Sequence, residues 1–141
     1  MAKRVWVLDA SVAVKWFFVD ESLRGKALAV REALATRPAE FVIPHLFHSE
    51  LVHVLARKSA HDLQFVRQAL DLVGRLGTST IGLSEHSLQV VADLACDGFS
   101  GYDATYLALA DDLGGLWLTA DARAASRAGP ARALGLDSWP G

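Results

Sequence analysis

The chain has 141 residues, a length typical of one compact domain. Apolar side chains make up 52% of the sequence and charged ones 21%, a balance that allows a buried core and excludes an intrinsically disordered chain. The 16 acidic and 14 basic residues leave a net charge of −2, which excludes a generally basic protein that coats nucleic acid but permits a local basic strip.

Five short apolar segments are predicted to form strands. The run at 5–8 is apolar throughout, as is typical of a strand buried on both faces of a sheet. The segment 78–83 carries β-branched residues at alternate places, and 134–136 is a small fifth candidate. In chain order the predicted strands are 5–8, 41–43, 78–83, 116–119 and 134–136.

Helices are predicted between these strands. Residues 21–36 place apolar side chains on one face with charges between them, which indicates an amphipathic helix. Asp62 is predicted to cap the helix that follows it. Short apolar strands that alternate with helices predict a three-layer α/β/α fold around a parallel sheet of four to five strands. The predicted helices are 10–18, 21–36, 45–59, 63–76, 84–96, 102–113 and a short one after Asp121.

The sequence shows no sign of a membrane segment or a disulfide framework. No uncharged stretch approaches the roughly 18 apolar residues of a membrane helix. The apolar run near the N-terminus is too short for the core of a secretory signal. Cys96 is the only cysteine, which excludes a disulfide and a cysteine-based zinc site. We therefore expect a cytoplasmic protein with a single domain over residues 1–141.

Four acidic residues stand where acids are unfavourable. Asp9 ends the first predicted strand and Asp121 lies two residues past the fourth, and ligands of open parallel sheets bind beyond the carboxyl ends of the strands. Glu50 and Asp103 lie on the apolar stripes of their predicted helices, where no lysine or arginine occupies a matching position. Two strand-end acids and two helix-face acids can converge at one crevice.

Such a group of carboxylates favours a bound cation. A buried carboxylate costs several kcal/mol unless it is paired or binds a metal. Two like charges about 4 Å apart repel by roughly 4 kcal/mol at an effective dielectric constant near 20, and a divalent cation removes that repulsion. Oxygen ligands alone favour magnesium or manganese over zinc, and these ions serve phosphoryl and phosphodiester chemistry.

Each acid, taken singly, also has a structural interpretation. Asp9 and Asp121 could cap the helices that follow them. Asp103 could interact with the dipole of its helix from the first turn. Glu50 could be a solvated acid in the middle of a helix. The combination of all four is much less probable by chance than any one of them.

Four motifs surround these acids in order: Asp9-Ala10-Ser11, the isolated Glu50, Tyr102-Asp103-Ala104 leading into 106–110, and Leu118-Thr119-Ala120-Asp121. Together they resemble a PIN-domain ribonuclease, and most of all the VapC toxins of bacterial and archaeal toxin–antitoxin pairs. The likeness spans residues 5 to about 123, and none of the four acidic positions departs from the family pattern.

The resemblance implies a function and a role for each acid. It implies a metal-dependent endoribonuclease that binds Mg²⁺ or Mn²⁺ in an acidic pocket and hydrolyses single-stranded or loop RNA with water as the nucleophile. Asp9 would be the central metal ligand together with Asp103 and Asp121, and Glu50 would bind a second ion or position the water. The implied partners are the RNA substrate and a VapB-like antitoxin, and we expect a homodimer.

Weaker expectations concern residues close to these motifs. By the same resemblance, Ser11 and Thr119 match hydroxyl positions that orient the ligand acids, although a helix N-terminal hydroxyl and an ordinary strand residue explain them too. Lys15 and Arg123 could contact RNA or be solvated side chains. The aromatic run 16–18 exceeds what one short helix buries and partly predicts a dimer or antitoxin surface.

Three other functions fit parts of the pattern. A receiver domain also has acids at strand ends, but here Asp9 has no acidic neighbour before it and residues 130–141 contain no lysine. A haloacid-dehalogenase-like phosphatase would have a second acid where Ser11 stands. The next alternative is a non-catalytic PIN-like module that binds RNA or protein, which would be expected to lack one or more of the four acids.

Overall fold

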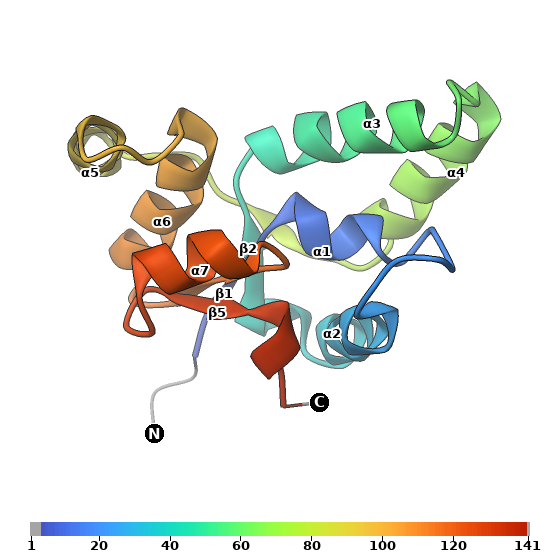
Figure 1. Cartoon of the computed structure of the whole chain (residues 1–141), viewed down its shortest axis with the longest axis horizontal. Coiled ribbons are helices and arrows are strands. Elements are labelled where there is room, and N and C mark those ends of the chain that lie inside the picture. The colour runs from blue at the N-terminus through green and yellow to red at the C-terminus, as the bar shows by residue number, and fades with distance from the viewer. Residues whose placement is uncertain (1–3, 141) are drawn as a thin grey trace.

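The computed structural model describes residues 4–140, which contain one five-stranded sheet (Figure 1). All strand pairs are parallel, and the order is β3-β2-β1-β4-β5. The predicted parallel sheet is confirmed, although the 78–83 segment contributes only two strand residues. The strands are β1 (Trp6–Leu8), β2 (Phe41–Ile43), β3 (Ser79–Thr80), β4 (Leu116–Thr119) and β5 (Ala133–Gly135).

Helices cover both faces of this sheet, as the three-layer prediction requires. Trp6 and Leu8 of β1 pack with the buried residues of α1 to α4, whereas Val7 packs with those of α5 to α7. Figure 1 shows α5 and α6 on one side of the strands and α2 and α4 on the other. The helices within residues 4–140 are α1 (Ala10–Val14), α2 (Arg24–Thr36), α3 (Leu46–Lys58), α4 (Leu63–Gly74), α5 (Glu85–Cys96), α6 (Gly101–Leu113) and α7 (Ala122–Ala128), with 3₁₀ turns η1 (Pro38–Glu40) and η2 (Leu136–Ser138).

Burial on both faces explains why the central strands are apolar without alternation. Every residue of β1 and β2 is buried. Fully burying one large apolar side chain contributes roughly 1.5–3 kcal/mol, so these short strands can be held by side-chain packing as well as by their ladders. Both residues of the edge strand β3 are exposed. The segment 78–83 is less apolar than the central strands, and the strand that it forms is shorter.

Side-chain caps fix the starts of α4, α5 and α6. Asp62 accepts a hydrogen bond from the backbone N–H of Phe65 at 3.1 Å, which confirms the predicted cap of α4. Ser84 and Ser100 cap α5 and α6 in the same manner. Removing such a cap costs about 1 kcal/mol.

The segment after β1 differs from its prediction. The predicted helix 10–18 ends at Val14, and the helix predicted from 21 begins at Arg24. Trp16 has only 3% of its surface exposed, and its indole N–H donates to the carbonyl of Ala27 at 2.8 Å. The chain turns here because Trp16 must enter the core beneath α2. The prediction that the run 16–18 forms a partner surface is therefore wrong for Trp16, while Phe17 and Phe18 are partly buried against the same core.

The order in which the chain adds strands to the sheet changes direction at β1, and this leaves a crevice beyond the end of that strand. The chain leaves β1 for β2 on one side and later returns through β4 on the other. The N–H of Asp9 donates to the carbonyl of Leu118 at 2.9 Å, so the two strands stay paired to their carboxyl ends. Residues that follow β1 and β4 therefore lie side by side at a topological switch point, the usual place for a ligand.

Among the helices of residues 4–140, none has the length and apolar character needed to cross a membrane.

Candidate active site

The two strand-end acids lie at this switch point, and each also caps a helix. Asp9 is buried; its Oδ2 accepts from the N–H of Ser11 at 2.9 Å and its Oδ1 from the indole N–H of Trp117 at 3.0 Å. Asp121 Oδ1 accepts from the N–H groups of Arg123 and Ala124 at 3.1 and 3.0 Å. The capping interpretation of both acids is thus correct, and it does not remove them from the crevice.

The two helix-borne acids reach the same region with fewer partners. Glu50 lies in the second turn of α3 and is partly buried. Its Oε1 is buried and has no hydrogen-bond partner among residues 4–140. Asp103 lies in the first turn of α6, where its backbone N–H donates to the Ser100 cap at 3.0 Å.

The electrostatics show that the four acids are neighbours. Burial raises the pKa of Glu50 to about 7, the charges of Asp9 and Asp103 add to that rise, and the nearby Tyr106 hydroxyl opposes it. Burial likewise raises the pKa of Asp103 above its usual range, with Asp9 and Asp121 contributing. The pKa of Asp9 is raised by burial and then by Asp121, against the hydrogen bonds from Ser11 and Trp117. Each of these carboxyl groups is therefore held where its charged form is unfavourable.

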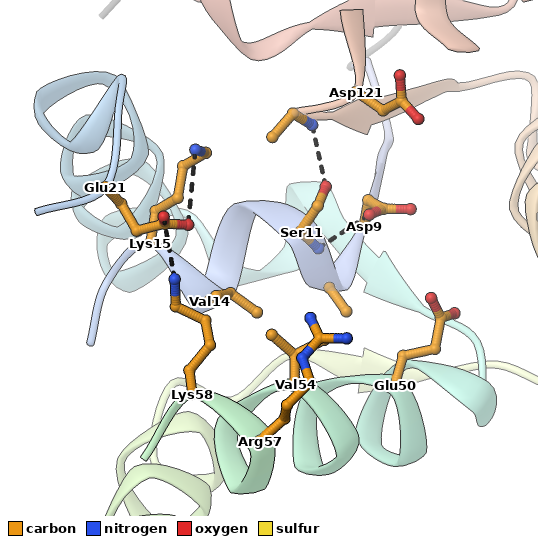
Figure 2. A pocket seen from close by; sticks show the side chains of 12 residues that line it. Asp9, Ser11, Val14, Lys15, Glu21, Glu50, Val54, Arg57, Lys58 and Asp121 are labelled. Atoms are coloured by element: carbon orange, nitrogen blue, oxygen red, sulfur yellow. Dashed lines mark hydrogen bonds and ion pairs between the residues drawn. The ribbon is translucent and has the colours of Figure 1, made fainter. Parts of the chain in front are cut away.

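A cavity of about 400 Å³ opens between α1, α3 and the loop after β4 (Figure 2). In Figure 2, Asp9, Glu50 and Asp121 lie at one side of it, and Lys15, Glu21 and Lys58 lie at the other. Asp103 is not part of this lining, although its charge acts on Glu50. The remaining lining residues are Ala10, Ser11, Val14, Val54, Arg57 and Ala120.

Two hydroxyl groups hold the loop that carries Asp121. Ser11 Oγ accepts from the N–H of Ala120 at 3.0 Å, and Thr119 Oγ1 accepts from the N–H of Asp121 at 3.1 Å. The two hydroxyl oxygens lie 3.4 Å apart. They therefore link the ends of β1 and β4 and position Asp121 through its main chain.

Comparisons with known proteins agree with this architecture. The PIN domain family matches residues 6–130, which is most of the chain. The chain belongs to the PIN-domain family.

Solved structures with a similar fold include two further proteins. One is VapC20 of Mycobacterium tuberculosis, a sarcin–ricin loop cleaving toxin: identity is 14%, coverage 79% of this chain and 86% of that chain, and the TM-score 0.63. The other is PAE2754 of Pyrobaculum aerophilum, with 18% identity, 96% and 92% coverage and a TM-score of 0.68. A comparison with curated protein sequences gives no match.

The donor set of this PIN domain fits a hard divalent cation. All four acids offer oxygen ligands, the kind that Mg²⁺ and Mn²⁺ prefer. Glu50 supplies the clearest sign, because its buried Oε1 lacks any donor from the described chain. In the described part of the chain, no three Asp, Glu, His or Cys side chains are already arranged as ligands of one ion. The site is thus a group of neighbouring, mutually repelling acids that a cation would draw together.

Two aromatic residues of the site were missed by the sequence interpretation. Trp117 of β4 donates to Asp9, and its ring stacks on that of Tyr106 with centroids 6.0 Å apart. The Tyr106 hydroxyl is buried without a hydrogen-bond partner among residues 4–140. Burial and the charges of Asp9 and Glu50 raise the pKa of Tyr106. The i, i+3 spacing from Asp103 did place Tyr106 on the site-facing stripe of α6, but an apolar stripe does not reveal a hydroxyl aimed at acids.

The two residues predicted to contact RNA, Lys15 and Arg123, differ in burial. Lys15 is buried, and its Nζ donates to the carbonyl of Ser22 at 2.8 Å and lies 3.8 Å from Glu21. Arg123 is exposed beside Asp121. The expectation that no arginine shares the helix face of Glu50 is wrong, because Arg57 at i+7 lies on the same face of α3 and lines the same cavity.

Proposed function

We propose that this PIN domain is a metal-dependent endoribonuclease and the toxin of a VapBC-type toxin–antitoxin pair. The observation that carries the proposal is Glu50, a partly buried carboxylate whose inner oxygen lacks a donor and whose charge opposes those of Asp9 and Asp103. Such an arrangement is costly unless a cation shares it. The similar fold of VapC20, a sarcin–ricin loop cleaving toxin, supports the choice of RNA as substrate.

Each residue of the site has a distinct role in this proposal. Asp9, Asp103 and Asp121 hold Mg²⁺ or Mn²⁺, which when bound supplies charge neutralisation at the phosphate and a more acidic water. Glu50, which lines the same cavity as Asp9 and Asp121, binds a second ion or positions the attacking water. Ser11 and Thr119 fix the loop of Asp121, and Trp117 fixes the orientation of Asp9.

The partners remain part of the proposal. A toxin of this kind needs an antitoxin that covers the acidic pocket, and a basic side chain would satisfy the acids when no substrate is bound. Because Trp16 is buried in the core, the apolar anchor of an antitoxin or of a homodimer does not include Trp16, and Phe17 and Phe18 remain its candidates in this run. Cytoplasmic action on RNA follows from the proposed activity.

The test uses the purified chain and a structured RNA in Mg²⁺, in Mn²⁺ and in excess EDTA. We expect cleavage with either metal, no cleavage in EDTA, and RNA ends at a small set of positions when the products are sequenced. Undiminished cleavage in EDTA would contradict the metal dependence. RNA binding without cleavage in either metal would favour the non-catalytic PIN-like module.

Expression in a bacterial host tests the toxin assignment separately. The chain alone should slow growth, and co-expression of a small neighbouring gene should restore it. A chain that cleaves RNA in vitro but is harmless when expressed would be a housekeeping nuclease.

A further inference from the structure

We infer that Arg57 forms a binding subsite for a phosphate group of the RNA backbone that flanks the scissile bond. This inference rests on the proposed function. It adds a subsite on α3, beside the acids, and assigns it the chemical class of its ligand.

The cavity contains three cationic side chains, and two of them already share one carboxylate. Glu21 lies 3.8 Å from Lys15 through Oε1 and 3.3 Å from Lys58 through Oε2. Lys15 also donates to the carbonyl of Ser22, and the ammonium of Lys58 lies 4.9 Å from the centre of the Phe18 ring. One carboxylate thus holds both lysines at the far end of the cavity from the acids.

Arg57 is the third cation, and its charge is not used in this way. Its guanidinium makes no ion pair and no hydrogen bond with any residue in the range 4–140. Arg57 is exposed to solvent yet lines the same cavity as Asp9, Glu50 and Asp121. Figure 2 shows it on α3 between the two lysines and the acids.

The chemistry of a guanidinium matches a phosphate. Its planar fork donates two parallel hydrogen bonds to phosphate oxygens and stays charged at every physiological pH. Arg57 lies two helical turns beyond Glu50, about 10 Å along the axis of α3, so RNA bound at the acids would pass over it. Arg57 would then contact a flanking phosphate, and phosphate contacts fix the register of a nucleic acid without reading its sequence.

A carboxylate from another protein could also meet Arg57, but the proposed substrate already has a suitable anion next to the site. A nucleic acid backbone carries a phosphate at every nucleotide, so a strand whose scissile phosphate lies at the acids presents a neighbouring phosphate along α3. The RNA is therefore the occupant that satisfies both ends of the cavity at once.

The experiment compares Arg57→Ala with the parent chain in steady-state RNA cleavage at several salt concentrations. We expect KM to rise about tenfold with kcat within about twofold of the parent, since a flanking contact adds mostly uniform binding. The slope of log(kcat/KM) against log[salt] should become shallower by about 0.7, the contribution of one phosphate of a single strand.

Three variants serve as controls. Arg67→Ala removes an exposed arginine from α4, outside the cavity, and should match the parent. Arg57→Lys keeps the charge but loses the fork, so its KM should lie between those of parent and Arg57→Ala while its salt slope stays that of the parent. Lys58→Ala should raise KM less than Arg57→Ala does, because Lys58 is already paired. Thermal unfolding confirms that each variant is folded.

The outcomes separate the inference from the proposed function. If the parent cleaves RNA and Arg57→Ala changes neither KM nor the salt slope, the subsite is wrong and the nuclease stands. An equal rise in KM for Arg67→Ala also overturns it, since that result reports net charge alone. A parent that cleaves no RNA overturns the proposed function and the inference with it.

Discussion

The acids that follow strands and the acids that lie on helices occupy one site but are held in different ways. Both oxygens of Asp9 accept hydrogen bonds, and one oxygen of Asp121 accepts two. Glu50 Oε1, by contrast, is buried without a donor. The difference follows from the backbone: a strand that runs into a helix meets free N–H groups, whereas the middle of a helix offers none.

This contrast separates structural from functional roles. An acid at a strand end has a reason to be there in any protein of this architecture, because it caps the next helix. An acid on the site-facing side of a helix has no such reason and costs stability until a ligand arrives. Glu50 is therefore stronger evidence for a cation site than Asp9, even though Asp9 is the more deeply buried.

The largest effect is expected from Asp9→Asn. Asparagine is nearly the same size and its oxygen can still cap α1, so the folded structure should persist although the bond from the Trp117 indole N–H is lost. Cleavage should fall roughly 1,000-fold, because the proposed central ligand loses its charge. Asp93→Asn, on the exposed face of α5, is the matched control and should retain full activity. Equal cleavage by the Asp9 and Asp93 variants would break the assignment of Asp9.

Glu50→Gln should lower cleavage by about 100-fold and stabilise the metal-free protein. The folded pKa of Glu50 is about 7, against an ordinary value of 4.5, so the folded state binds this proton more tightly than the unfolded state does. Stability is therefore greatest below the ordinary value and is lost as the pH rises through about 7. Glutamine carries no charge, so the variant does not lose this stability as the pH rises.

Urea unfolding in EDTA at about pH 5 and about pH 8 measures the effect. Glu50→Gln should be more stable than the parent at the higher pH and nearly equal to it at the lower one. The raised pKa values of Asp9 and Asp103 act in the same direction, so some pH dependence should persist. Glu32→Gln, an exposed change on α2, should follow the parent at both values. If Glu50→Gln has the same stability as the parent at both pH values, the charge of Glu50 does not destabilise the folded protein.

Trp117→Phe sharpens the comparison by removing one donor from a strand-end acid. The ring stays in the core, but Asp9 Oδ1 loses its hydrogen bond at 3.0 Å. We expect Mn²⁺ affinity, measured calorimetrically, to fall about tenfold, as is typical when a residue that orients a ligand is lost. Trp139→Phe is the control, because Trp139 is equally buried but packs on Trp6 and Phe41. A similar loss of Mn²⁺ affinity in both variants would indicate a general packing defect.

Sequence patterns were most reliable where local chemistry decides the structure. The apolar runs of β1 and β2, the Asp62 cap and the four acids were all recognisable, because strand burial, capping and charge on an apolar stripe have distinct signatures. The turn after Val14 was not recognisable. It depends on the contact of Trp16 with Ala27, and a residue eleven positions away leaves no periodic signal.

Parts of the site were also hidden from the sequence for this reason. Trp117 appears in the sequence as one more apolar strand residue. Only the pairing of β4 with β1 brings its indole to Asp9. The pairing of Glu21 with both Lys15 and Lys58 joins the loop between α1 and α2 to the end of α3. Arg57 stands out only once that pairing is known, because it is the cavity cation that makes no ion pair with residues 4–140.

The smallest effect is expected from Ser11→Ala, which tests how far the strand-end acids depend on the loop between them. The substitution leaves the Asp9 hydrogen bonds from the Ser11 N–H and the Trp117 indole in place, but it removes the hydroxyl that lowers the pKa of Asp9 and accepts from the Ala120 N–H. One net hydrogen bond is worth about 1 kcal/mol, and part of it returns when water reaches the exposed side of the loop. We therefore expect cleavage to fall about threefold, with Mn²⁺ affinity reduced to the same degree, because Asp121 is displaced through its main chain. Ser22→Ala, which changes a hydroxyl at the lysine end of the cavity, should have no such effect on Mn²⁺ affinity. A Ser11→Ala protein with unchanged Mn²⁺ affinity would show that Asp121 is held well enough by its own cap on α7.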